Sequence, residues 1–282
     1  MAVTIEPVAP EDAIAYWRGR SAQLLTSWSW QDVAAAQHRA GFTVAKGMQA
    51  DVLQWLAAGV DRALEDGIAM RQFANELEPK LAAAGWWGEA EEVDPLDGRT
   101  KRVRLGSLSR LRTIFNANVN SAYAAGDWAR IQRTAASHPY LMYSAVRDNR
   151  TRPEHAAWDG LILPHDHPFW ETHFPPNGWN CRCHTIQVSQ DLLDENGWTV
   201  SEAPQIRVRP WTNSRTGEVI DVPLGIDPGW AHNPGAVSPE AIASAALGQR
   251  LLDLPADLRA AMRLVLRSHV DPAPPGPRPE VI

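Results

Sequence analysis

The chain has 282 residues, of which 44% are hydrophobic and 21% charged, a composition ordinary for a folded globular protein with one large domain or two smaller ones. Its formal net charge of −6 argues against non-specific DNA binding by the chain as a whole, while leaving room for a local basic patch. No stretch approaches the roughly 20 apolar residues that span a bilayer, and the first residues lack the pattern of a signal peptide. We therefore expect a protein made in the cytoplasm and without a membrane partner.

The N-terminal part of the chain has helical patterns. Apolar residues at helical spacing predict a helix in two pieces over 11–40 and a cleaner helix over 47–65. Another helix is predicted over 70–81, and we expect Pro79 to kink or split it. The run over 89–104 switches from acidic to basic residues, which predicts a solvated loop.

The longest helical pattern covers 107–136. Asn118 shares a face of this helix with apolar residues, so it is either a buried amide with a required partner or simply exposed. Both readings stay open at this point.

Strands are predicted after the long helix. Short apolar runs at 140–146 and 185–188 predict two of them. The segments 206–209 and 218–222 flank a turn and predict a hairpin.

The C-terminal part is predicted to hold two short helices, one starting at Ser238 and one over 256–268. The proline-bearing tail over 271–282 is expected to be extended. The resulting fold class is α+β: a mainly helical N-terminal region, a central domain with a small β-sheet and a long clamped loop, and a short helical C-terminal tail.

The segment 148–184 is the chemically richest part of the chain. Its prolines and glycines exclude a long helix, and a long loop inside a domain needs something to hold it. A bound metal, a packed aromatic set, or both would serve. The aromatic set is Trp158, Phe169, Trp170, Phe174 and Trp179. The segment contains both cysteines of the chain and five of its nine histidines: Cys181, Cys183, His155, His165, His167, His173 and His184.

A structural zinc site is one interpretation of this segment. In an extended chain, side chains two residues apart face the same way, so Cys181 and Cys183 would present both sulfurs to one ion. Zinc takes about four N or S ligands. His155 is the preferred third ligand, because it follows a strand that should lie near the strand leaving the loop. The alternates are Asp148, His165 and His167. In the competing interpretation, the thiols pack and the histidines hydrogen-bond around the loop without a metal.

Three arginines stand beside Asp148: Arg147, Arg150 and Arg152. They predict either a contact with a phosphate or acidic partner, or internal Arg–Asp pairs that order the loop, and we prefer the second. The residues expected to hold the loop are Arg150, Arg152, Asn180 and Asn118.

A catalytic site is a further interpretation of this segment. A Cys–His pair can form a thiolate nucleophile, but nothing in the sequence selects one cysteine. The residues Asn149, His155, Asn180 and His184 are compatible with a metal-dependent nuclease of the His-Asn-His kind. Prolines in the intervening chain, and the lack of a predicted helix close after His155, argue against it. No catalytic residue is assigned, and a metal-dependent hydrolase or nuclease using the His/Cys cluster is the alternative function.

Several segments together resemble the phage head morphogenesis family, the Mu F-like and SPP1-like minor head proteins. The segment 148–155 (Asp-Asn-Arg-Thr-Arg-Pro-Glu-His), Gly160 and the Asn-Cys-Arg-Cys run at 180–183 carry the signature. The long helical stretch at 111–123 and the turn-rich segment at 227–235 agree with it in order and spacing.

The resemblance implies a virion protein of the phage head, made in the bacterial host cytoplasm and associated with the portal vertex during procapsid assembly. Its implied partners are the portal protein, the major capsid or scaffold protein and, in some relatives, packaged double-stranded DNA. It implies no enzyme activity, and structural zinc is the only cofactor considered. The expected domains are an N-terminal arm over 1–46, the family domain over 47–235 and a C-terminal part over 236–282.

Overall fold

The computed structural model describes residues 10–32 and 41–236. The helices and tail predicted from Ser238 onward lie outside the described residues, as does the 33–40 part of the first predicted helix. The described chain combines helices with several small sheets, so the predicted α+β class is confirmed. None of the described helices is both long and apolar enough to cross a membrane.

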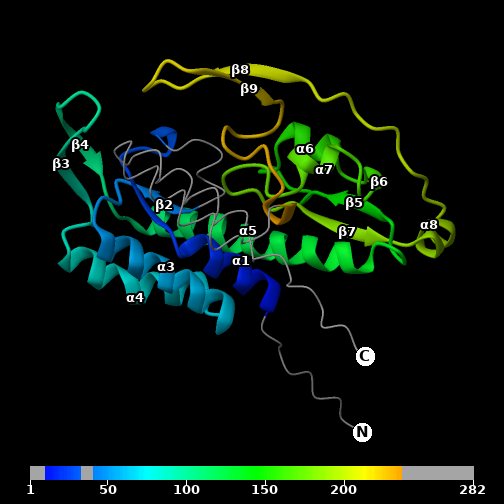
Figure 1. Cartoon of the computed structure of the whole chain (residues 1–282), viewed down its shortest axis with the longest axis horizontal. Helices are drawn as coiled ribbons and strands as arrows, with labels where there is room; N and C mark the ends of the chain where they lie inside the picture. The colour runs from blue at the N-terminus through cyan, green and yellow to red at the C-terminus, as the bar shows by residue number, and fades with distance from the viewer. Residues whose placement is uncertain (1–9, 33–40, 237–282) are drawn as a thin grey trace, which may run out of the picture.

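A helical layer forms the N-terminal half (Figure 1). It contains α1 (Glu11–Ser21), α3 (Ala50–Glu65), α4 (Met70–Ala83) and the first half of α5 (Leu108–Thr134). One face of α3 is buried against the other helices, as its periodicity predicts. Its buried residues are Val52, Leu53, Leu56, Ala57, Val60, Ala63 and Leu64.

The prediction of a second helical piece after α1 is wrong for the described residues. The chain forms strand β1 (Leu24–Ser27), which pairs in parallel with β2 (Phe42–Ala45), and then a short 3-10 turn, η1 (Trp30–Asp32). Phe42 is fully buried in the helical core, so this strand pair closes one side of it. Burial at a strand pair therefore outweighed a weak helical pattern.

Helix α4 continues through Pro79, against the expected kink or split. Pro79 lies on the exposed face, as does Asn75, whose carbonyl loses its usual partner there. Water can satisfy that carbonyl, so the helix does not need to break.

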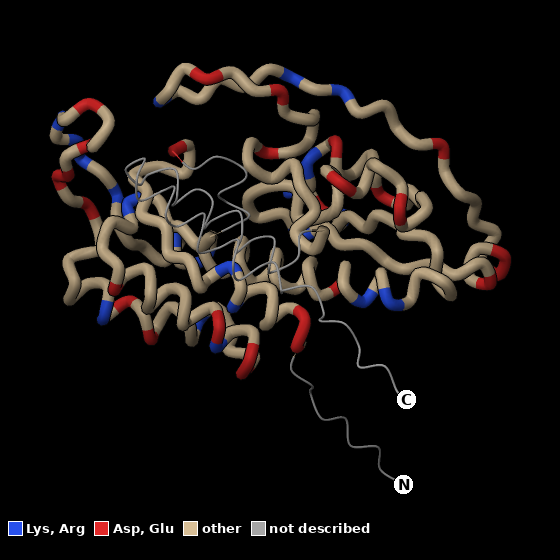
Figure 2. Tube along the Cα trace, viewed as in Figure 1, with Lys and Arg blue, Asp and Glu red and all other residues tan. Residues whose placement is uncertain are grey.

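The run over 89–104 forms an antiparallel hairpin instead of the predicted loop. Strand β3 (Glu89–Val93) carries the acidic residues and β4 (Thr100–Arg104) the basic ones. Pairing places Glu89 opposite Arg104 and Glu92 opposite Lys101, so opposite charges meet across the strands. Figure 2 shows acidic and basic residues side by side in this part of the chain. The charge switch was a hairpin signal.

Helix α5 joins the two halves of the molecule. It has 27 residues, a length of about 40 Å, and Figure 1 shows it running through both halves. Ser107 caps its start, because the Ser107 Oγ accepts a hydrogen bond from the Arg110 amide at 3.2 Å. Leu111 and Ile114 belong to the helical core, whereas Ile131 belongs to a second core.

The second core packs around a three-stranded sheet with strand order β6-β5-β7. Strand β5 (Tyr140–Ser144) is central and pairs antiparallel with β6 (Ile162–Pro164) and β7 (His184–Val188), close to the predicted strands. Two short helices, α6 (Pro153–Ala157) and α7 (Phe169–His173), lie in the connections. The predicted aromatic set packs here in part, since the second core includes Phe169, Trp170 and Phe174, with Trp158 against it.

A long excursion then crosses the molecule. After α8 (Gln190–Asn196), residues 198–207 have no regular structure and lead into the hairpin of β8 (Val208–Thr212) and β9 (Val219–Pro223). We call residues 198–223 the strap. Figure 1 shows the strap passing from the sheet side back over the helical half. The predicted hairpin is confirmed, and the described chain ends with the 3-10 turn η2 (Pro234–Ala236).

The strap is fastened at its tip. The Arg215 guanidinium donates to both carboxylate oxygens of Asp94, at 2.7 and 2.9 Å, and also to Asp32. Asp94 is fully buried in the turn after β3. The Asn213 amide donates to the Gln31 carbonyl at 2.8 Å. The hairpin tip is therefore bound to two segments of the N-terminal half, η1 and the turn after β3.

Candidate functional site

The pairing of β5 with β7 brings together the two ends of the segment 148–184, which we call the cysteine-rich loop. Ser144 lies opposite His184, so the chain leaving β5 and the chain entering β7 share one edge of the sheet. Cys181 and Cys183 come just before β7, and His155 stands on α6. The expectation that the segment before His155 follows a strand beside the exit strand is therefore met.

His155, Cys181 and Cys183 form one cluster. The Nδ1 atom of His155 lies 3.7 Å from the Cys181 Sγ and 3.5 Å from the Cys183 Sγ. All three candidate ligand atoms lie within 4.8 Å of one another. Tetrahedral zinc with ordinary Zn–N and Zn–S bonds separates neighbouring N and S ligands by about 3.6 Å. The spacing thus fits a shared zinc ion as well as it fits weak hydrogen bonds.

The protonation of His155 is fixed from its other side. Its Nε2 lies 2.8 Å from the Gly225 carbonyl, which can only accept, so Nε2 carries the proton. In the neutral ring, Nδ1 then presents a lone pair to the two sulfurs. Histidine ligands of metals usually donate their remaining N–H to a carbonyl or carboxylate in this way. The His155 ring is therefore oriented as a metal-binding histidine would be.

Gly225 allows this carbonyl to approach. Its φ is +83°, and a Cβ placed there would lie 2.6 Å from Trp158 Cη2 and 2.7 Å from Glu154 Cβ. Only glycine therefore fits without displacing α6, on which His155 stands. Gly225 was not predicted, because a lone glycine distant in the chain carries no sequence signal of this contact.

The two thiols have different acidities. The hydrogen bond from Cys181, and then the contacts with His155 and Tyr143, lower the pKa of the Cys183 thiol. The hydrogen bond to Cys183 and burial raise the pKa of the Cys181 thiol. The contacts therefore favour loss of the Cys183 proton and retention of the Cys181 proton. Because thiolates bind metals, a nearby cation would favour loss of the second proton as well.

Asp148 holds the loop and does not join the cluster. The Arg182 guanidinium donates to both Asp148 oxygens at 2.7 and 2.6 Å, and the Arg150 amide donates at 3.0 Å. The hydrogen bonds with Arg182 hold the pKa of Asp148 well below its usual range. The preferred interpretation of an internal Arg–Asp pair fits these contacts, although Arg182 was not predicted as the partner. Arg147 pairs with Asp159 at 2.5 Å.

A second ion pair anchors the chain before Cys181. Arg152 donates to the Asp227 carboxylate at 2.7 Å, and the Trp179 amide donates to the same oxygen at 2.8 Å. A Cβ on Gly178 would lie 2.4 Å from both side chains. Arg152 was predicted to hold the loop, whereas Asp227 was not. Fully buried Asn177 was also missed: its Oδ1 accepts from the Tyr143 hydroxyl at 2.9 Å.

The alternate ligands lie elsewhere. His165 contacts the Pro139 carbonyl at 3.2 Å, and the His167 Nδ1 accepts from the Phe169 amide at 3.1 Å. His173 is buried against Phe169, and burial lowers its pKa to about 4. Among the described residues, the metal-type cluster contains only His155, Cys181 and Cys183. Of the residues weighed for a His-Asn-His site, His155 belongs to this cluster and Asn180 lines the same cleft, while Asn149, Asn180 and His184 are exposed.

Asn118 is a buried amide with partners, one of the two readings that the sequence left open. Its Nδ2 donates to the Ile114 carbonyl at 2.7 Å, and its Oδ1 accepts from Arg20 at 3.0 Å. The bond from Arg20 ties α1 to α5, the bond to Ile114 lies within α5, and neither reaches the cysteine-rich loop.

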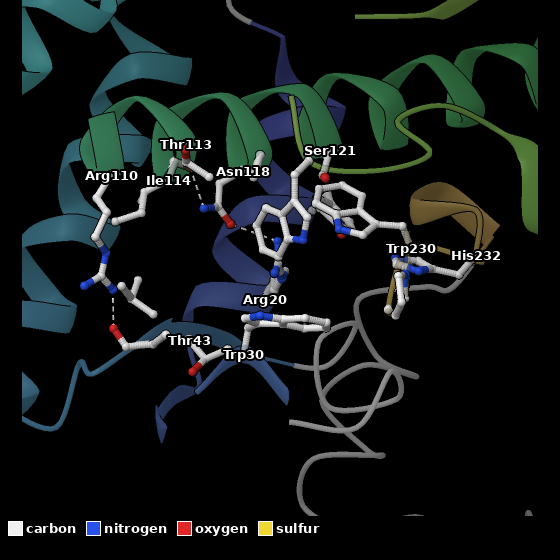
Figure 3. Close-up of a pocket in the computed structure, with 17 residues that line it drawn as sticks. Arg20, Trp30, Thr43, Arg110, Thr113, Ile114, Asn118, Ser121, Trp230 and His232 are labelled. Carbon is white, nitrogen blue, oxygen red and sulfur yellow. Dashed lines mark hydrogen bonds between the residues drawn. The ribbon is translucent and has the colours of Figure 1, made fainter. Parts of the chain in front are cut away.

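Asn118 also faces a cavity of about 290 Å³ between the helical half and the turn at 228–232 (Figure 3). Three tryptophans from distant segments line it: Trp30, Trp179 and Trp230. Trp179 lies edge-on to both Trp30 and Trp230. Part of the tryptophan excess of the chain, 13 in total, therefore serves the junction between the two halves.

Comparisons with known proteins agree on one group. The family model described as "Phage Mu protein F like protein" matches residues 54–186. The chain is 39% identical over 243 residues to the "Putative capsid assembly protein F" of Escherichia phage Mu, covering 81% of this chain and 55% of that protein. It is 37% identical over 177 residues to the "Mu-like prophage FluMu F protein" of Haemophilus influenzae, covering 63% of this chain and 42% of that protein. The chain thus spans about half the length of these curated relatives. No solved structure matches it significantly.

Proposed function

Through residues 54–186 the chain belongs to the Phage Mu protein F like family, and from this premise we propose that it is a phage head protein acting in head morphogenesis. The observation that carries the proposal is its 39% identity, over 81% of its length, to a protein named for capsid assembly. The matched family segment runs from α3 into β7 and contains the whole His/Cys cluster.

The proposed partners are the portal protein, the major capsid or scaffold protein and packaged double-stranded DNA, with the protein located in the virion after synthesis in the host cytoplasm. Support for protein partners comes from the strap, which exposes many large apolar side chains. Exposed apolar groups gathered on one segment are typical of contact surfaces. They are Trp198, Val200, Ile206, Val208, Val219 and Ile220.

The proposed cofactor is one zinc ion bound by His155, Cys181 and Cys183. The N–S spacing of 3.5 and 3.7 Å and the bond from His155 to the Gly225 carbonyl support it. The ion would supply a cross-link between α6, the residues before β7 and the turn at 225. Its role would be to make the loop a rigid part of a building block, with no substrate turned over.

The head-assembly role is tested by co-producing the tagged chain with the other head proteins encoded beside it and isolating the heads by sedimentation. We expect the chain in the head fraction, and we expect that fraction to lose it when the portal gene is omitted. The variants His155→Asn and Cys183→Ser should be depleted from heads. The matched control is His184→Asn, an exposed histidine outside the cluster.

Two results would contradict this proposal. One is free chain at the top of the gradient whichever head proteins are present. The other is metal-dependent cleavage of DNA by the purified protein that His155→Asn abolishes while the fold survives. The second result would favour the nuclease alternative.

A further inference from the structure

The His/Cys cluster supplies three ligand atoms, one fewer than tetrahedral zinc requires. The nearby side-chain oxygens that could act as a fourth metal ligand already take part in hydrogen bonds. The Tyr143 hydroxyl donates to Asn177, and Asp148 accepts from Arg182 and Arg150. Three protein ligands with an exchangeable fourth position are the pattern of open zinc sites, whereas purely structural sites are usually closed by a fourth side chain.

All three cluster residues line one cleft of about 460 Å³. The cleft lies between α5 on one side and the loops at 146–152 and 179–183 on the other. The cluster is therefore reached from this cleft, although His155 itself is only 2% exposed. Because all three side chains line this cleft, a further ligand of an ion held by them would reach it from there. Tyr143, whose ring centroid lies 6.5 Å from that of His155, is fully buried.

The cleft is strongly basic. No Asp or Glu occurs among the described residues that line it, and four of those residues are arginines: Arg112, Arg150, Arg152 and Arg182. Two carboxylates outside the lining, Asp148 and Asp227, pair with three of these arginines. The Arg112 side chain, on α5, makes no hydrogen bond or ion pair with another described residue. A surplus of positive charge therefore faces the open metal position.

The remaining lining groups suit an oxyanion. Asn116 and Asn120 line the same cleft from α5, and the Asn120 amide, which donates one N–H to the Cys181 carbonyl at 3.3 Å, keeps a second N–H. Thr113 also lines the cleft, but its hydroxyl donates to the Ser109 carbonyl. Guanidinium groups recognise phosphate oxygens through paired N–H bonds, and zinc binds hard oxygen donors as a fourth ligand.

Building on the zinc proposed above, we infer that the cleft between α5 and the cysteine-rich loop is a phosphate-binding site, in which a phosphate monoester or inorganic phosphate completes the coordination of the metal and pairs with Arg112. The site binds the anion and performs no chemistry on it. The phosphate source is either free phosphate or the terminal phosphate of a nucleic acid strand.

The test replaces zinc with Co²⁺ in the full chain under reducing conditions and follows the visible absorption of the thiolate-bound ion. Inorganic phosphate should shift the cobalt bands with a saturable dependence on concentration. The Arg112→Ala variant should bind Co²⁺ equally but lose affinity for phosphate by about tenfold, the loss of one charge-assisted hydrogen bond. Arg207→Ala is the matched control, an exposed arginine on the strap outside the cleft, and should behave as the unsubstituted chain.

A second arm compares two short oligonucleotides that differ only in a 5′-phosphate. A band shift with the phosphorylated strand alone supports the inference and identifies a nucleic acid end as a source. If one equivalent of Co²⁺ binds but neither phosphate nor the phosphorylated strand changes its spectrum, the phosphate site is wrong while the metal clamp stands. If no metal binds, both are wrong, yet the head-assembly role is still judged separately by the sedimentation experiment.

Discussion

Gly225 shows how much a single small residue controls at the cluster. Its carbonyl accepts the Nε2 proton of His155 and so decides that Nδ1 faces the sulfurs. The same residue packs against Trp158 and Glu154, which leave no room for a side chain. A metal site here depends on a backbone atom 70 positions away from the histidine it orients.

Replacing Gly225 with Ala should lower zinc affinity by about 10- to 100-fold, the usual effect of losing the partner that orients a histidine ligand. The measurement is competition with a chromophoric chelator. Gly217→Ala is the control, because Gly217 also has a positive φ of +78° but has open space around it. Both changes impose the same backbone strain, so equal losses in the two variants would contradict a specific role for Gly225.

At the scale of single residues, the sequence indicated which side chains form the cluster but not which residues hold the loop around it. The Cys-x-Cys spacing and the position of His155 after a strand were enough to place the three cluster residues together. The partners Arg182, Asp227 and Asn177 depend on segments meeting in space, and no local pattern encodes such a meeting. Asp148 illustrates the limit, since its chemistry fitted a ligand as well as an ion pair until Arg182 was located.

Among the elements, α5 carries most of the organisation, and its start is fixed by Ser107. We expect Ser107→Ala to lower the free energy of unfolding by about 1 kcal/mol, because the Arg110 amide loses its acceptor. Chemical denaturation measures this directly. Ser109→Ala is the control in the same helical turn, because the Ser109 hydroxyl contacts that of Ser107 and caps no backbone amide of the described chain. A loss of similar size in both variants would show that the cap is not the cause.

Long periodic elements were predicted well, and so were the apolar strands β5 and β7, whereas β1 and β3 were missed. The periods of α3 and α5 extend over several turns, so the pattern outweighs local exceptions. Strands β1 and β3 have four or five residues, and their pairing partners decided their conformation. The charged residues of β3 and β4 predicted a solvated loop, although each acidic residue of β3 lies across from a basic residue of β4.

At the scale of the whole molecule, the strap makes a second connection between the two halves, in addition to α5. It leaves the sheet after α8, crosses to the helical half and is fastened there by Arg215 on the buried Asp94. Lys101 also bonds Asp94, at 2.7 Å. The predicted division at 1–46, 47–235 and 236–282 stays a prediction. Helix α1, from the first of these segments, packs within the same core as α3 and α5.

This fastening should depend on pH. The hydrogen bonds from Arg215 hold the pKa of Asp94 well below its usual range. A carboxylate with a depressed folded-state pKa stabilises the fold above its unfolded pKa of about 4, and that contribution is lost as pH falls below this value. Arg215→Met should therefore lower the urea midpoint at pH 7 and flatten its decline toward pH 3.

The matched variant for this comparison is Arg209→Met, an exposed arginine on β8 of the same hairpin. Its midpoint should follow that of the unsubstituted chain at every pH. Parallel acid declines in all three proteins would mean that Asp94 contributes nothing through Arg215.

Because α5 packs in both cores, its length is constrained more strongly than its amino-acid composition. Adding or deleting one residue near its middle would turn everything after it by about 100°, swinging the sheet and the cysteine-rich loop out of alignment with the helices. Length variation between homologues should therefore accumulate in the strap or in the turn between β3 and β4, while the register of α5 stays intact.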